Sequence, residues 1–341
     1  MSDETARLIE QTADDLFATE SAAARIALAS GAWPQRLWQT FAETGLAQAA
    51  LPESAGGAGL AAGLAVMRAA GRHAAPVPVA ETMVAALLCH AAGVETPDGP
   101  LTVYTPATGE PVDLSSTAPR RVPWARFASV AVIAGPGGRL ALYMPVGVLE
   151  DSNLAGEPRD DVTQAVPLLA VDAPPKPVDA PALMALARAA QLRGAMEQVL
   201  AMSMRYASER EQFGRPLTKF QAIQHYLAEI AGETAASGAA VDAAAQAGTR
   251  FAFAAAKARA SQAAGTVARL AHQVHGAIGY TVEHDLHHWT TRLWAWRDEC
   301  GNEAHWWQAL GREAARGGGT ALWPTMVAAG AGATAGEGDG L

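Results

Sequence analysis

Cysteine is almost absent from this chain: of its 341 residues, two are cysteines, Cys89 and Cys300. Two cysteines so far apart in sequence are too few for the disulfide framework of a small secreted domain. Free thiols persist in reducing compartments. We therefore expect a cytoplasmic protein.

Blocks of basic residues are also missing. The chain has 25 Lys and Arg against 34 Asp and Glu, a formal net charge of −9, which argues against nucleic-acid binding. Its longest apolar stretches are alanine-rich and are broken by Gln, Arg or Gly before the ~20 residues that a membrane-spanning helix needs. The first residues, MSDETARLIEQ, are acidic and lack the apolar core of a signal peptide. We expect a soluble intracellular protein that contacts neither nucleic acid nor membrane.

Hydrophobic residues make up 50% of the chain, enough for one large core or for two to three sub-domains. Helical periodicity predicts an all-helical first domain over 1–98, with four helices: 3–30, one from Pro34 to about 44, 60–74 and 77–92. Between the second and third helices, the glycines of 51–59 indicate a loop. This loop lacks the G-x-x-x-x-G-K-[ST] pattern of a phosphate-binding loop, so a structural role is favoured over a phosphate site.

A small β domain is predicted over 99–173. Four short β-branched or apolar runs, separated by Pro and Gly, indicate strands at 101–105, 129–134, 139–144 and 165–171. Gly135 to Gly138 is expected to form the hairpin loop between the second and third of them.

The last part returns to helical periodicity, so the fold is expected to be mainly α. A proline-rich linker at 174–180 leads into a C-terminal helical bundle, taken as a four-helix bundle over 174–316. Its helices are predicted at 181–210, 217–247, 250–275, 283–298 and 301–314. The Gly- and Ala-rich segment 317–341 is predicted to be disordered.

The stretch RYASEREQFGRPLTKFQ, residues 205–221, lies at the corner between two long predicted helices. The twelve residues from 210 to 221 include six side chains suited to binding a ligand: Arg210, Gln212, Phe213, Arg215, Lys219 and Gln221. Arginine presents a rigid fork of donors that matches phosphate, and phenylalanine offers a flat surface for an aromatic ring. The corner could therefore hold a dinucleotide; the alternative is an ordinary solvated turn.

This stretch closely resembles the R-x-Q-F-G … F-Q signature of the acyl-CoA dehydrogenase family, with Arg210, Phe213 and Gln221 at its positions. A second family motif, Q-x-x-G-G-x-G-[FY], is similar to the segment from Gln273 to Tyr280. There Gly276 is retained and Ala277 replaces the second glycine. The loop at 51–59 is also similar to a family loop, P-E-x-x-G-G-x-G. The resemblance implies that Arg210, Phe213 and Gln221 contact the pyrophosphate and adenosine half of a neighbouring subunit's FAD. It also implies that Gln273, Gly276 and Ala277 bind the cofactor.

The resemblance further implies α,β-dehydrogenation of an acyl-CoA, in which a carboxylate removes the α-proton and flavin accepts the β-hydride. Counting without gaps from Gln273 places the usual base position at Cys300, with Glu299 one residue away and Glu303 three. Glu299 is the candidate base; the alternative is that it belongs to a solvated helix end. A second base position known in the family falls near Met184, which has no carboxylate beside it.

Two further family motifs, T-E-x-x-x-G-S-D and W-I-[TS]-N, grip the flavin ring in typical members and are missing from the β domain. We therefore interpret the chain as a degenerate acyl-CoA dehydrogenase subunit that completes the FAD site of a second subunit, within a heterotetramer. The resemblance connects such pairs with fatty acid or steroid side-chain degradation and with a separate electron acceptor. The alternatives are a self-sufficient homo-oligomer that uses Glu299, and a catalytically silent binding or scaffold protein.

Histidines and tryptophans gather near the end of the chain. A metal site is not expected, because no H-E-x-x-H or C-x-x-C pattern accompanies the histidines His272, His275, His284, His287 and His288. Large apolar anchors in the core and between subunits are the expected role of the tryptophans Trp289, Trp294, Trp296, Trp306 and Trp307.

Overall fold

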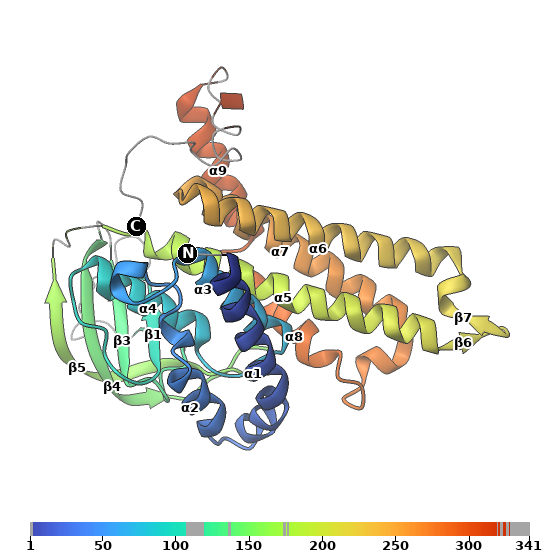
Figure 1. Cartoon of the computed structure of the whole chain (residues 1–341), viewed down its shortest axis with the longest axis horizontal. Coiled ribbons are helices and arrows are strands. Elements are labelled where there is room, and N and C mark those ends of the chain that lie inside the picture. Colours follow the sequence, from blue (N-terminus) through green and yellow to red (C-terminus); the bar gives the residue numbers. More distant parts are fainter. Residues whose placement is uncertain are drawn as a thin grey trace. The chain divides into compact units, whose positions relative to one another are not determined.

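A computed structural model describes residues 3–106, 119–135, 138–172, 175, 177–318, 320, 323–324 and 327. The chain divides into two compact units (Figure 1). The first contains Met1–Ala70 and Ala75–Ala187, and the second contains Gly71–Ala74 and Arg188–Glu337.

The first unit opens with helices, as predicted: α1 (Asp3–Ala29), α2 (Gln35–Glu43), α3 (Leu60–Arg72) and α4 (Val79–Ala91). Two short 3₁₀ turns, η1 (Leu46–Gln48) and η2 (Glu53–Ala55), form the loop between α2 and α3. The apolar face of α1 packs on α2, where the rings of Phe17 and Phe41 lie 5.9 Å apart. Glu10 of α1 accepts a hydrogen bond of 2.8 Å from Arg68 of α3.

The sheet of this unit has five strands: β1 (Leu101–Tyr104), β2 (Val122–Pro123), β3 (Val130–Ala134), β4 (Leu140–Leu149) and β5 (Arg159–Val171). Their order is β1-β3-β4-β5-β2. β1 and β3 are parallel, and the other pairs are antiparallel. α4 lies against β1, where the Thr82 hydroxyl exchanges hydrogen bonds of 3.1 and 3.2 Å with the Leu101 backbone. Because α4 is covered by its neighbours, its residues from Val79 to Cys89 are all buried.

The strands extend further than the sequence pattern predicts. β5 begins at Arg159 rather than near 165, β4 continues to Leu149, and β2 was missed. The first residues of β5 are charged, and a search for apolar runs overlooks them. Asp160 is fully buried there because Arg126 donates to its carboxylate. The predicted hairpin joins β3 and β4, which do pair antiparallel, but residues 136–137 of its loop lie outside the described residues.

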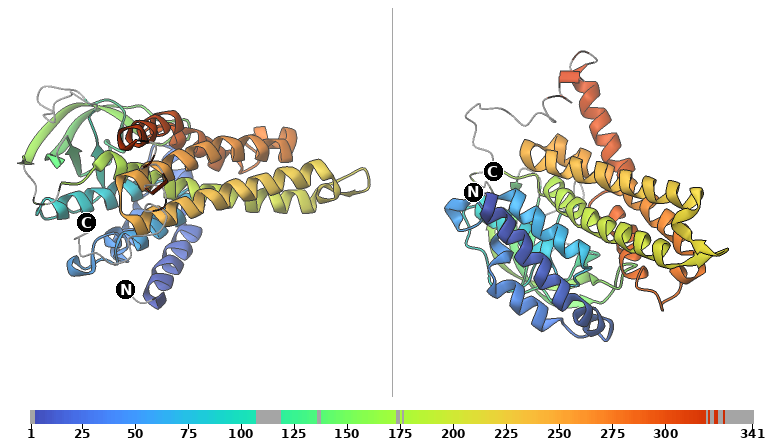
Figure 2. Two further views of the ribbon diagram at one scale, coloured as in Figure 1. Left: turned by 90° about the horizontal axis from the view of Figure 1, so that it is seen from above. Right: turned by 45° about the vertical axis from the view of Figure 1, so that its right-hand side comes forward.

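The second unit is helical and contains most of α5 (Ala180–Glu209), then α6 (Gln221–Ala247), α7 (Arg250–His275), α8 (His287–Asp298) and α9 (Glu303–Gly317). α5, α6 and α7 run side by side in Figures 1 and 2. α7 also packs against α8 and α9. Arg193 of α5 links to α6 through an ion pair of 2.6 Å with Asp242.

Three predicted helix starts were wrong. α6 begins at Gln221 instead of 217, because residues 217–219 form a single 3₁₀ turn, η4 (Leu217–Lys219), followed by an extended Phe220. α8 begins at His287 instead of 283; before it, the Leu286 N–H donates to the side chain of His284. α9 begins at Glu303 instead of 301, where the Asn302 side chain caps the helix by accepting from the His305 N–H at 3.0 Å.

The corner between α5 and α6 is a hairpin and not a simple turn. β6 (Glu211–Gln212) and β7 (Arg215–Pro216) pair antiparallel around a two-residue loop. Phe213 and Gly214, which form that loop, have φ angles of 52° and 74°. Two successive positive φ values are the signature of a type I′ turn, whose twist suits a tight hairpin.

Several expectations concern residues outside the described part. The predicted disordered tail from 317 is described only at 317–318, 320, 323–324 and 327, and two residues of the proline-rich linker, 174 and 176, are left out. Within the described residues, no helix combines the length and the apolar character needed to cross a membrane.

Candidate cofactor-binding site

A cavity of about 680 Å³ lies at the hairpin end of the second unit. Three segments line it: the end of α5 with its hairpin, the start of α6, and the end of α7 with the following 3₁₀ turn, η5 (Gly276–Tyr280). The lining residues are Tyr206, Arg210, Gln212, Phe213, Leu217, Phe220, Ile223, Gln273, Val274, His275, Gly276, Ala277 and Ile278. Segments more than fifty residues apart in sequence therefore share one cavity.

Arg210 supplies the positive charge of this cavity. Its backbone is fixed twice, because its N–H donates to Tyr206 and its carbonyl accepts from Leu217, both at 2.9 Å. Its side chain is exposed and forms no ion pair among the described residues. A guanidinium that lines a cavity and has no ion-pair partner among the described residues is available to an anion such as phosphate.

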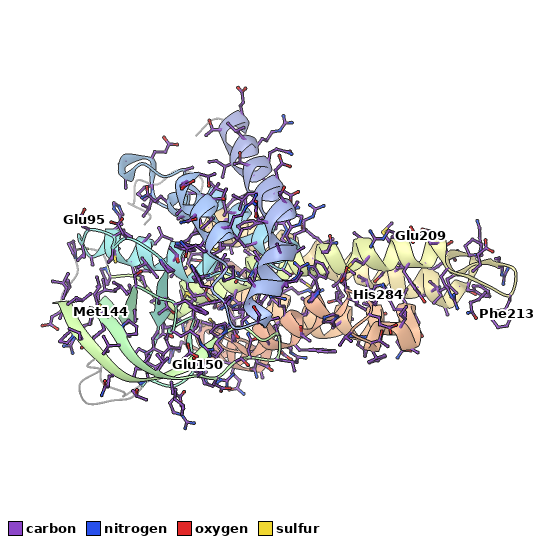
Figure 3. All side chains as sticks on the ribbon, turned by 90° about the horizontal axis from the view of Figure 1, so that it is seen from below. Glu95, Met144, Glu150, Glu209, Phe213 and His284 are labelled. Atoms are coloured by element: carbon purple, nitrogen blue, oxygen red, sulfur yellow. The ribbon has the colours of Figure 1, made fainter. Side chains whose placement is uncertain are left out.

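The hairpin adds an aromatic wall. Phe213 is 91% exposed, and Figure 3 shows it at the tip of the hairpin. Its ring centroid lies 6.1 Å from that of Phe220, and Arg215 lies over the Phe220 ring at 4.3 Å. Phe213 combines an exposed ring with a positive φ, and a non-glycine residue at positive φ is strained. Backbone strain of this kind is concentrated at ligand-binding sites. These rings suit a flat aromatic ligand.

The second motif forms the opposite wall. α7 ends at His275, and Gly276, with φ of 63°, turns the chain away from the helix. The turn is tight: a Cβ on Gly279 would lie 2.9 Å from the Cβ of His275. Ala277, which replaces the family's glycine, does not have a positive φ, so its methyl group causes no backbone strain.

Five of the residues predicted from sequence thus line one cavity: Arg210, Phe213, Gln273, Gly276 and Ala277. Gln221 does not line it; it is exposed at the first position of α6.

The structure also adds residues that the sequence reasoning missed, notably Tyr206 and His275. The sequence contained a signal for both residues. Tyr206 precedes Arg210 by one helical turn, and His275 occupies a variable position inside the second motif.

The histidines near this wall are packed among aromatic rings. His272 lies between Tyr280 and Trp294, with ring centroids 4.4 and 5.4 Å away. Burial lowers the pKa of His272, so its neutral form is favoured. In the described part of the chain, no group of three or more His, Cys, Asp or Glu side chains is placed to hold a metal ion.

The turn between α8 and α9 carries the candidate base, Glu299. Its carboxylate pairs with Arg188 of α5 at 3.0 Å, and the side chain of Arg188 is 2% exposed. This ion pair holds one carboxylate oxygen of Glu299 against α5. The neighbouring carboxylate, Glu303, is paired with Arg297.

Lys257 fixes the backbone of the same turn through hydrogen bonds. Its buried ammonium donates to the hydroxyl of Ser261 at 2.7 Å and to the carbonyls of Arg297 and Gly301, each at 2.8 Å. Burial is the main cause that lowers the pKa of Lys257 to about 8. Cys300, in the middle of this turn, has a positive φ of 55°. The turn is thus fixed by buried cations.

Models of the acyl-CoA dehydrogenase N-terminal and C-terminal domains match residues 3–96 and 182–298 of the chain. The acyl-CoA dehydrogenase IpdE2 of Mycobacterium tuberculosis is 32% identical to it over 83% of this chain and 89% of that protein. The chain belongs to the acyl-CoA dehydrogenase family. As a member of this family, the protein is an oxidoreductase that acts on acyl-CoA, and the resemblance seen in its two motifs is confirmed.

Solved structures of acyl-CoA dehydrogenases share the fold of this chain. The chain is similar to the Tcur3481-Tcur3483 steroid ACAD, with 26% identity and a TM-score of 0.79 over 92% of this chain and 98% of that one. It also shares its fold with the ChsE4-ChsE5 complex from Mycobacterium tuberculosis, at 22% identity and a TM-score of 0.75, over 92% of this chain and 98% of that one.

Proposed function

We propose that this chain is one subunit of a hetero-oligomeric, FAD-dependent acyl-CoA dehydrogenase, and that its cavity completes the FAD site of a partner subunit. One observation carries the proposal. The cavity joins both family motifs around Arg210, a guanidinium without an ion-pair partner in the described chain.

The lining residues fit the adenosine and pyrophosphate half of FAD. Arg210 would pair with the pyrophosphate, and Phe213 with Phe220 would contact flat parts of the ligand. Gln273 is exposed on the opposite wall, beside the backbone of Gly276 and Ala277. A volume of about 680 Å³ is within the usual range of ligand pockets, roughly 300–1,000 Å³. When bound, the flavin supplies the acceptor for the β-hydride of the acyl-CoA.

The chemistry at the acyl group is assigned to the partner. Glu299 is engaged with buried Arg188, and Lys257 fixes the turn around it. The family motifs that grip the flavin ring are absent from this sequence. A partner that brings the ring pocket and the base accounts for both facts. The names of two structural relatives, a steroid ACAD and a two-protein complex, support a paired enzyme for bulky acyl-CoA esters such as those of steroid side chains.

In this proposal the chain has a helical domain over 1–98, a β domain over 99–173 and a bundle over 174–316. The helices α5, α6, α7 and α8 make up the four-helix bundle through which the subunits assemble. Its rigid helices hold the hairpin and the η5 turn at one end. Electrons from the partner's flavin would then pass to a separate electron-transfer acceptor.

The test is to purify the chain alone and then together with a co-expressed dehydrogenase partner, and to count flavins per chain. We expect no flavin on the chain alone, and half as many flavins as chains in the complex. A yellow protein with an absorption band at ~450 nm from this chain alone, one flavin for each copy, would contradict the proposal.

Replacing Glu299 with Gln tests where the base lies. We expect Glu299→Gln to leave dehydrogenation by the complex nearly intact, because Gln keeps the volume and an acceptor oxygen for Arg188. Removal of a true catalytic base lowers the rate by ~10²–10⁴ or more. Turnover is measured with an artificial electron acceptor.

Glu303→Gln, which removes the ion pair with Arg297, is the matched control for lost charge in this turn. A large fall in turnover for Glu299→Gln alone, with normal FAD content, would show that this chain carries the base.

A further inference from the structure

We draw no further inference here: the strongest candidate, the side-chain cluster of Lys257 and Cys300 at the turn between α8 and α9, rests on one cysteine and on the pKa of Lys257, which burial lowers, and nothing in the described residues shows a ligand or reactant that this cluster would receive.

Discussion

Arg210→Ala is expected to strip FAD from the assembled complex while leaving the helices intact. A charge-assisted contact to phosphate contributes ~1.5–3 kcal/mol, which corresponds to a loss of affinity of about 10- to 150-fold. The fold does not depend on this side chain, because Arg210 is exposed and forms no ion pair in the described chain. The measurement is flavin released per complex after dialysis, together with ADP affinity of the chain alone.

Arg205→Ala is the matched control for this change. Arg205 is also exposed, lies near the end of α5, five residues before Arg210, and does not line the cavity. It should retain FAD at the wild-type level. Equal FAD retention by the Arg210 and Arg205 variants would remove Arg210 from the cofactor site.

Trp296→Ala is expected to cause the largest loss of stability. Trp296 is 1% exposed, and two guanidinium groups lie near its ring, that of Arg188 at 5.5 Å and that of Arg292 at 6.0 Å from its centroid. Truncating a buried tryptophan leaves a cavity and costs about 3–5 kcal/mol of the free energy of unfolding. The arginines would lose their packing surface as well. Urea denaturation followed by circular dichroism measures the change.

Trp307→Ala provides the comparison, because Trp307 lies on the next helix and is 46% exposed. A surface substitution of this kind shifts stability by only about 0.5 kcal/mol. If Trp296→Ala were as mild as Trp307→Ala, the packing described around α8 would be wrong.

The tryptophans also show the limit of composition as a guide. All five near the C-terminus were predicted to be core or interface anchors. Trp289, Trp296 and Trp306 are buried within the chain, whereas Trp307 keeps much of its surface exposed. Periodicity indicates that a helix has an apolar face, but the width of that face depends on which helices pack against it.

The helices themselves were predictable because their signals are local. Apolar residues repeat at helical spacing, and Gly or Pro marks most ends; α7 matches its predicted span of 250–275. The errors arose where a side chain competes with the helix for backbone groups, as at His284, or where charged residues form a buried strand, as at Asp160. The partner of Asp160, Arg126, comes from a distant part of the chain.

The sequence by itself determined the family and the identity of the two motifs, because these depend on residue type and order. Only the tertiary structure decided that Arg210 and Gln273 share a cavity, that Gln221 does not line it, and that Glu299 is paired with Arg188. It also showed that, among the described residues, Nε2 of the buried His275 has no hydrogen-bond partner. Contacts between distant segments depend on how helices pack, and packing is a property of the whole unit rather than of any local pattern.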